Sequence, residues 1–85
     1  MSTRLDEYID FPIIFTFKIV GDNASTFTVG VESVFDDYPE KSIVPTESAS
    51  GKYISLSVTA EIQSHDELKS LYERISVLRG LRFYV

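Results

Sequence analysis

The chain alternates apolar and polar residues over two long stretches. In residues 11–20 every odd position carries a large apolar side chain, and in residues 52–62 every even position from Ile54 onward is apolar. A strand with one buried face has this period of two. The pattern therefore predicts two long strands, each with one apolar and one largely polar face.

Two shorter runs predict two further strands. Residues 41–47 contain Pro45, which has no N–H to donate to a neighbouring strand and therefore belongs at a sheet edge. Residues 81–85 follow a glycine and form the last strand. Three of its side chains are expected to face the core: Leu81, Phe83 and Val85.

The clearest helix signal comes directly after the second long strand. Ser64 and Glu67 have the spacing of a capping box, in which the serine hydroxyl accepts a helix N–H and the glutamate reaches back. An apolar stripe at helical spacing follows, and Gly80 is the expected end of the helix. The stripe consists of Leu68, Leu71, Tyr72, Ile75 and Leu78.

Residues 24–37 permit two interpretations. They alternate like a strand over residues 27–31, whereas a stripe with helical spacing extends over residues 27–35. We favour a helix, because it explains the longer span and keeps the acidic residues off the apolar stripe. Gly30 weakens such a helix by up to ~1 kcal/mol.

The elements follow one another as strand, helix, strand, strand, helix, strand. Each helix carries one apolar stripe and each long strand one apolar face, so both helices must cover the same side of one sheet. The predicted fold is an α+β ferredoxin-like βαββαβ sandwich with a four-stranded antiparallel sheet. Right-handed crossovers give the strand order 4-1-3-2, with the two helices on one face.

A single domain accounts for most of the 85 residues. Residues 1–10 are largely polar and are predicted to form a flexible N-terminal arm, followed by one domain at residues 11–85. The chain has no cysteine, so neither a disulfide framework nor a thiolate metal site is available. Because it has no apolar run of about 20 residues and no apolar signal core, we expect a cytoplasmic location and no membrane contact.

The charge of the chain argues against nucleic acid as a partner. The formal net charge is −5, whereas phosphate backbones are bound by clusters of Lys and Arg. The uncovered sheet face is expected to present Lys18, Tyr53, Ser55, Arg82 and Tyr84 as interface residues. RNA-binding sheets stack bases on aromatic residues along a strand, and Ser55 occupies such a position here. These observations count against nucleic acid, and an RNA- or nucleic-acid-binding ferredoxin-like module is kept only as the alternative to the favoured function.

The sequence contains no catalytic motif. His65 is its only imidazole. A further alternative, a minor enzyme, would have to use His65 together with Asp22 as its acid–base pair. Asp36, Asp37 and Glu40 form an acidic cluster that lacks the ligand spacing of a calcium loop. We therefore expect no catalytic residue, no metal and no cofactor.

Several short segments, taken together, resemble one protein family. They are Phe11-Pro12, Lys18-Ile19-Val20-Gly21, Ser48-Ala49-Ser50-Gly51-Lys52-Tyr53, Ser57-Val58-Thr59, and Asp66-Glu67-Leu68 with Leu71-Tyr72. In this order they are similar to the small bacterial YbeD-like family, a domain of unknown function. The resemblance implies a ferredoxin-like fold related to ACT regulatory domains, which bind amino acids and pair through their sheets.

The favoured function is a small non-enzymatic regulatory or adaptor module with a small-molecule or protein partner. A homodimer through a sheet edge is expected, because residues 81–85 form a short edge without proline. Gly21, Asp22 and Asn23 form the turn before the first helix, where the resemblance to ACT domains implies a small ligand. Asn23 or Ser25 is expected to cap that helix.

Overall fold

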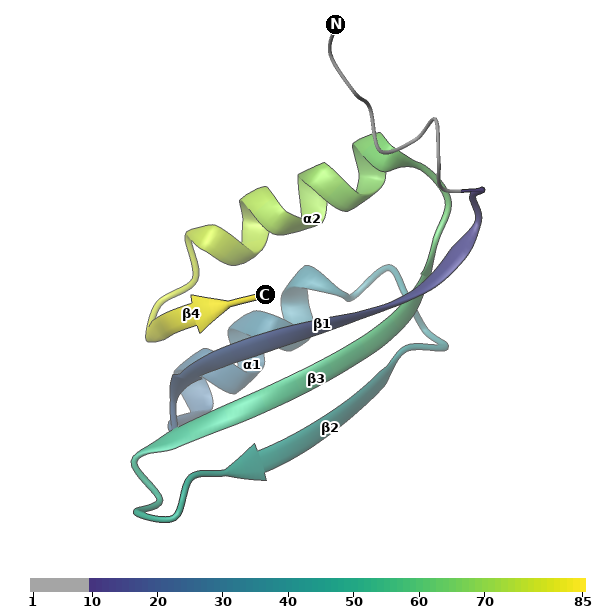
Figure 1. Ribbon diagram of the computed structural model, residues 1–85. Helices are drawn as coiled ribbons and strands as arrows, with labels where there is room; N and C mark the ends of the chain where they lie inside the picture. The colour runs from purple at the N-terminus through teal and green to yellow at the C-terminus, as the bar shows by residue number, and fades with distance from the viewer. Residues whose placement is uncertain (1–9) are drawn as a thin grey trace, which may run out of the picture.

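The computed structural model describes residues 10–85, which form one sheet and two helices (Figure 1). The elements are β1 (Ile13–Asp22), α1 (Ser25–Val34), β2 (Ser42–Glu47), β3 (Tyr53–Ile62), α2 (His65–Ser76) and β4 (Leu81–Tyr84). The predicted order of strands and helices is confirmed, including the helix chosen for the ambiguous segment. The predicted arm lies outside the described residues, except for Asp10. Neither described helix has the length and apolar character needed to cross a membrane.

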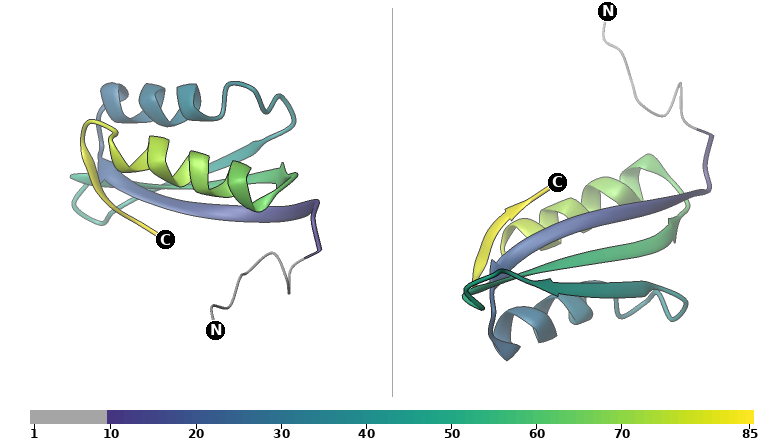
Figure 2. Two further views of the ribbon diagram at one scale, coloured as in Figure 1. Left: turned by 90° about the horizontal axis from the view of Figure 1, so that it is seen from above. Right: turned by 60° about the horizontal axis from the view of Figure 1, so that its bottom comes forward.

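The sheet has the order β2-β3-β1-β4, which is the predicted order counted from the other edge. All neighbouring strands are antiparallel. β1 and β3 pair along their whole length, from Ile13 opposite Ile62 to Asp22 opposite Tyr53. Both helices cover one face of the sheet (Figure 2). We call the other face the open face.

The core lies between the sheet and the helices. The even positions of β3 are buried as predicted, and Phe17 and Ile19 of β1 are fully buried. Phe17 lies at the centre of an aromatic cluster, with ring centroids between 4.8 and 5.2 Å from its own. Its neighbours in this cluster are Phe15, Phe35 and Tyr72. The alternating pattern therefore identified the buried face of both long strands correctly.

α2 begins with a modified capping box. The N–H of Glu67 donates to the Ser64 hydroxyl at 3.1 Å, as predicted. The Glu67 carboxylate accepts from the N–H of Gln63 at 3.2 Å. The helix ends at Ser76, so the prediction that it runs to Gly80 was wrong. Beyond the helix, the N–H of Leu78 donates to the Ile75 carbonyl at 3.1 Å. This bond forms a tight turn, so the chain leaves the helix before Gly80.

α1 is shorter than predicted, and the predicted caps are absent. The helix follows Ala24, which has no side-chain oxygen, so neither Asn23 nor Ser25 is its N-cap. The Asn23 side chain is used elsewhere, because its Nδ2 donates to the Gly51 carbonyl at 3.0 Å. Burial of three side chains holds the helix instead: Phe27, Val31 and Val34.

β4 contains a β-bulge that the sequence pattern did not predict. Val20 pairs with Phe83, but the next residue, Gly21, pairs with Leu81, so Arg82 is the extra residue of the bulge. An extra residue shifts the alternation of side chains by one position. Every residue after the bulge therefore faces opposite to the prediction.

The bulge accounts for three wrong predictions. Phe83 and Val85 were expected in the core, but their side chains are 56% and 69% exposed. Tyr84 was expected on the open face, but its ring lies 5.8 Å from that of Tyr72 in α2, which is on the helix side. Leu81 precedes the bulge and packs against the core as predicted.

Candidate functional site

The turn between β1 and α1, predicted to hold a ligand, is closed by its own contacts. A side chain on Gly21 would collide with the ring of Phe27, so this glycine permits the close packing of α1 on β1. The N–H groups of Asp22 and Asn23 both donate to carbonyls of the chain, at 2.9 and 3.0 Å. These two N–H groups are therefore already used within the chain.

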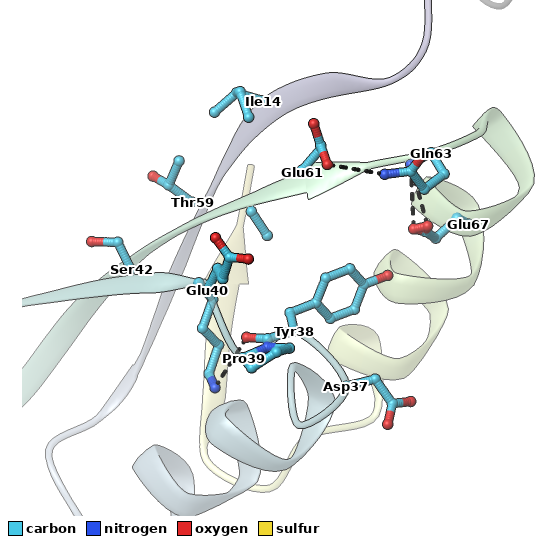
Figure 3. A pocket seen from close by; sticks show the side chains of 12 residues that line it. Ile14, Asp37, Tyr38, Pro39, Glu40, Ser42, Thr59, Glu61, Gln63 and Glu67 are labelled. Carbon is cyan, nitrogen blue, oxygen red and sulfur yellow. Dashed lines mark hydrogen bonds between the residues drawn. The ribbon is translucent and has the colours of Figure 1, made fainter.

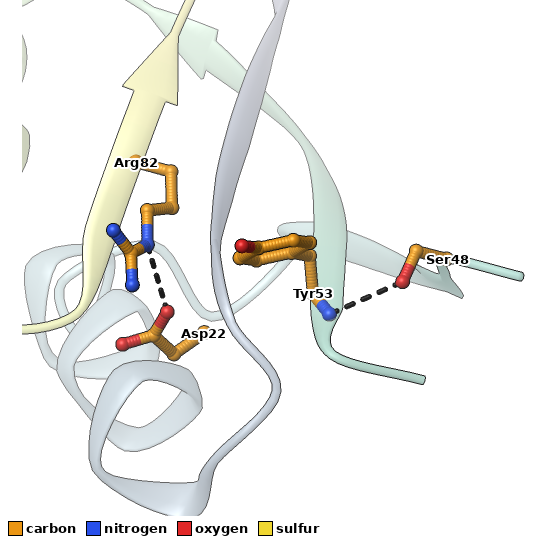
Figure 4. A network of polar contacts seen from close by, with 4 residues as sticks. All are labelled: Asp22, Ser48, Tyr53 and Arg82. Atoms are coloured by element: carbon orange, nitrogen blue, oxygen red, sulfur yellow. Dashed lines mark hydrogen bonds and ion pairs between the residues drawn. The ribbon is translucent and has the colours of Figure 1, made fainter. Parts of the chain in front are cut away.

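Three of the predicted residues meet beside this turn (Figure 4). Nε of Arg82 donates to Oδ1 of Asp22 at 2.8 Å, and the guanidinium lies over the Tyr53 ring, 5.6 Å from its centroid. The hydrogen bond to Asp22, together with its negative charge, raises the pKa of Arg82. Both charged side chains are about half exposed, at 56% and 43%, so solvent screens the ion pair.

The middle of the open face carries hydroxyl groups and one lysine. Lys18 pairs with Ser57 of β3, and Ser55 lies two residues away on the same face. The hydroxyls of Thr16 and Thr59 are 2.9 Å apart and hydrogen-bonded. Among the described strands, the middle of this face offers no row of aromatic rings on which nucleic-acid bases would stack.

The two edges of the sheet carry different side chains. On the β4 edge, three consecutive apolar residues are exposed, namely Phe83, Tyr84 and Val85. On the β2 edge, Ser48 donates its N–H to β3, so by alternation the backbone of Pro45 faces away from the sheet. The proline thus stands where an outward N–H would otherwise invite another strand.

A cleft of about 640 Å³ opens where β2 begins (Figure 3). The loop after α1, the end of β3 and the start of α2 line it, and the lining includes Tyr38 and three acidic residues, Glu40, Glu61 and Glu67. Burial, followed by the nearby Glu67, raises the pKa of Tyr38 to about 12. This cleft was not predicted, because its lining comes from segments that only the fold brings together.

The pair on which an enzymatic role would depend is not formed. Asp22 lies opposite Tyr53 at one end of the β1–β3 ladder. His65 begins α2 just after Ile62, which marks the other end. Within residues 10–85, no three His, Cys, Asp or Glu side chains are grouped so that they could hold a metal ion.

Comparison with known sequences gives matches along nearly the whole chain. A family model described as "Protein of unknown function (DUF493)" matches residues 6–85. A UPF0250 protein of Shewanella putrefaciens is 33% identical over 84 residues, and the match covers 96% of both chains. A UPF0250 protein of Shewanella oneidensis is also 33% identical with the same coverage.

Solved structures share the fold at lower identity. Protein HP0495 from Helicobacter pylori has a TM-score of 0.71 at 19% identity, covering 91% of this chain and 85% of its own. The ACT domain from the GTP pyrophosphokinase of Chlorobium tepidum has a TM-score of 0.68 at 15% identity, covering 87% of this chain and 96% of its own. At these identities the likeness concerns the fold alone.

Proposed function

The chain belongs to the DUF493 family, and we propose that it is a non-enzymatic regulatory or adaptor module that binds other chains along the β4 side of its sheet. The YbeD-like resemblance is confirmed for the family and the ACT-like fold. The fold itself hosts many activities, so the proposal rests on the surface of this chain.

The observation that carries the proposal is the run of exposed apolar residues on β4. Phe83, Tyr84 and Val85 are 56%, 39% and 69% exposed on an edge strand without proline. Natural sheets usually protect such an edge with charge, proline or a covering segment. An unprotected apolar edge favours pairing with another strand.

A second copy of this chain is the first partner we propose. Tyr72 of α2 contacts Phe17 of β1 and Tyr84 of β4, so α2 lies above the boundary between these strands. With strands ~4.8 Å apart, a two-fold axis beside β4 would place the two α2 helices ~10 Å apart, a normal packing distance. Lys69 and Glu73 lie one turn apart on the exposed side of α2. In the antiparallel helix pair of such a dimer, Lys69 of each copy would lie near Glu73 of the other copy.

Sedimentation equilibrium tests this dimer. Phe83→Glu places a charge on the β4 edge and should shift the protein to monomer at concentrations where the wild type is dimeric. Val29→Glu is the matched control, because Val29 is 57% exposed but lies on α1. A wild type that stays monomeric at high micromolar concentration, or equal effects of both substitutions, would contradict the dimer.

A small anionic ligand beside the β1–α1 turn is the second candidate. It is favoured by the half-exposed Arg82, for which it would compete with Asp22, and by the start of α1, where the first N–H groups have no side-chain cap. Thermal unfolding with a panel of amino acids and organic acids tests it. A ligand at ~100 times its dissociation constant should add ~2.7 kcal/mol of stability, and Arg82→Gln should reduce that gain. An unchanged melting temperature across the panel would count against this candidate.

A further inference from the structure

The N-terminal half of β1 lies at the same side of the sheet as β4. β4 pairs with β1 at residues 19–21, and Val85 exchanges two backbone hydrogen bonds with Lys18. Among residues 10–85, no strand pairs with residues 13–17 on this side. We propose that this segment, the open edge of β1, docks an extended segment of a partner protein in line with β4. The inference rests on the adaptor role proposed above and specifies the partner's chemistry.

The open edge offers backbone N–H and C=O groups to an added strand. Lys18 directs both its N–H and its C=O toward Val85, on the β4 side. The pairing of β1 with β3 is continuous, so alternate residues point the same way. Ile14 and Thr16 therefore direct their N–H and C=O groups outward. A strand seated there would satisfy all four groups.

Apolar side chains flank the open edge on both faces. On the open face, Ile14 is 69% exposed. On the helix side, the ring of Phe15 packs edge-on against Tyr72 at 6.3 Å, and Tyr84 continues the row. A docked strand with apolar residues on both faces would contact Ile14 below and these aromatic rings above, which is how strand addition gains specificity.

A second copy of this chain does not fit the open edge through its own β1. Because Tyr72 touches both Phe15 and Tyr84, α2 lies above the place where the added strand would run. A two-fold axis beside β1 would bring the two α2 helices onto the same line, well inside the 8–10 Å that helix axes require. The occupant must be a single extended segment with no helix above it.

The surroundings also define the length and charge of this segment. The site is five residues long, because Val85 closes one end and the chain bends away before Ile13 at the other (Figure 2). Lys18 is exposed at the Val85 end, and Lys69 is exposed on α2 one turn from Tyr72. These two lysines favour an acidic residue beside them, whereas Glu61, which lies opposite Ile14 on the open face, favours an uncharged residue there. We therefore infer an extended, apolar segment that carries Asp or Glu.

Peptide selection tests the inference. A phage-displayed library of random 12-residue peptides is selected on the full-length protein, and the enriched peptides are synthesised. Binders with alternating apolar residues and at least one acidic residue are expected. Thr16→Pro removes an outward N–H that β3 does not use, so it should weaken these peptides about tenfold or more.

A second pair of variants keeps the test valid if Thr16→Pro does not fold. Ile14→Glu should repel the acidic peptides and remove an apolar contact. Val44→Glu is the control, because Val44 is 56% exposed on the same face but lies on β2. In amide hydrogen exchange, bound peptide should protect Ile14 and Thr16. Equal binding to the wild type and all variants, selection at background level, or protection confined to other strands would overturn the proposal.

The dimer and the docking site can fail separately. Phe83→Glu acts on the β4 edge and should leave peptide affinity within about twofold, because Phe83 points to the open face beside Val20 and not to residues 13–17. If Phe83→Glu has no effect on assembly while Thr16→Pro abolishes peptide binding, only the dimer is lost. If Phe83→Glu removes peptide binding as strongly as Thr16→Pro, the separate docking site is refuted.

Discussion

The first half of the molecule (β1, α1 and β2) has a helix without a cap and a fully paired edge strand, whereas the second half (β3, α2 and β4) has a capped helix and a short, irregular edge strand. In the first half, α1 has no side-chain cap and no acidic residue in its first turn, but its strand β2 pairs along all six residues. In the second half, α2 has a side-chain cap, acidic residues at its start and Arg74 at its end. Its strand β4 has four residues, a bulge and an exposed apolar edge.

The difference shows where each half obtains its stability. α2 has favourable local interactions at both ends, whereas α1 depends on tertiary burial to remain helical. β2 closes its side of the sheet with Pro45 facing outward, whereas on the β4 side no strand of the described residues 10–85 pairs with residues 13–17 of β1. The first half is thus completed within the chain. The second half presents the groups through which we propose that the module binds.

The largest expected effect concerns the anchor of α1. Phe27 is 1% exposed and packs against Gly21 of β1. Phe27→Ala should lower the free energy of unfolding by about 3–5 kcal/mol, measured by urea denaturation followed by circular dichroism. Val29→Ala on the exposed side of the same helix should change it by less than about 0.5 kcal/mol. Similar small losses for both would show that α1 does not depend on burial.

Sequence patterns predicted the first half and the long strands well, because their apolar residues report burial directly. The helix over residues 25–34 was recognised by its stripe although local signals at its start were misleading. The pattern failed on β4, where a single extra residue, Arg82, reversed the side chains that follow it. A bulge leaves no mark in a four-residue run, so the position of Tyr84 depended on pairing with β1. Arg82, the extra residue of the bulge, lies beside Asp22 and Tyr53.

The next effect concerns the close packing of α1 on β1 within the first half. Gly21→Ala forces a methyl group into the ring of Phe27 and should destabilise the protein by about 1–3 kcal/mol. A denaturation midpoint equal to that of the wild type would show that Phe27 can move aside. Gly51→Ala serves as a comparison, since no atom lies within 4 Å of the added group and its cost comes from a backbone φ of +76° alone.

A smaller effect should distinguish the two helix starts. Ser64→Ala removes the hydroxyl that accepts the N–H of Glu67 and should cost about 1 kcal/mol in unfolding free energy. Ala24→Ser supplies the oxygen that α1 lacks and should increase stability by about 0.5 kcal/mol or more. If both substitutions were neutral, local capping would not account for the contrast between the helices.

The smallest expected effect concerns the ion pair that ties β1 to β4. Asp22 and Arg82 are both about half exposed, so solvent screens their attraction. β4 is also held by backbone bonds that do not depend on charge, including the one from the Asp22 N–H to the Gly80 carbonyl. Asp22→Asn should therefore leave the urea midpoint unchanged within error, both in low salt and at 1 M NaCl. A clear loss of stability that salt abolishes would show that charge, and not the backbone ladder, keeps β4 on the sheet. In that case the bulge at Arg82 would serve chiefly to reach Asp22, and the surface left for partners would depend on ionic strength.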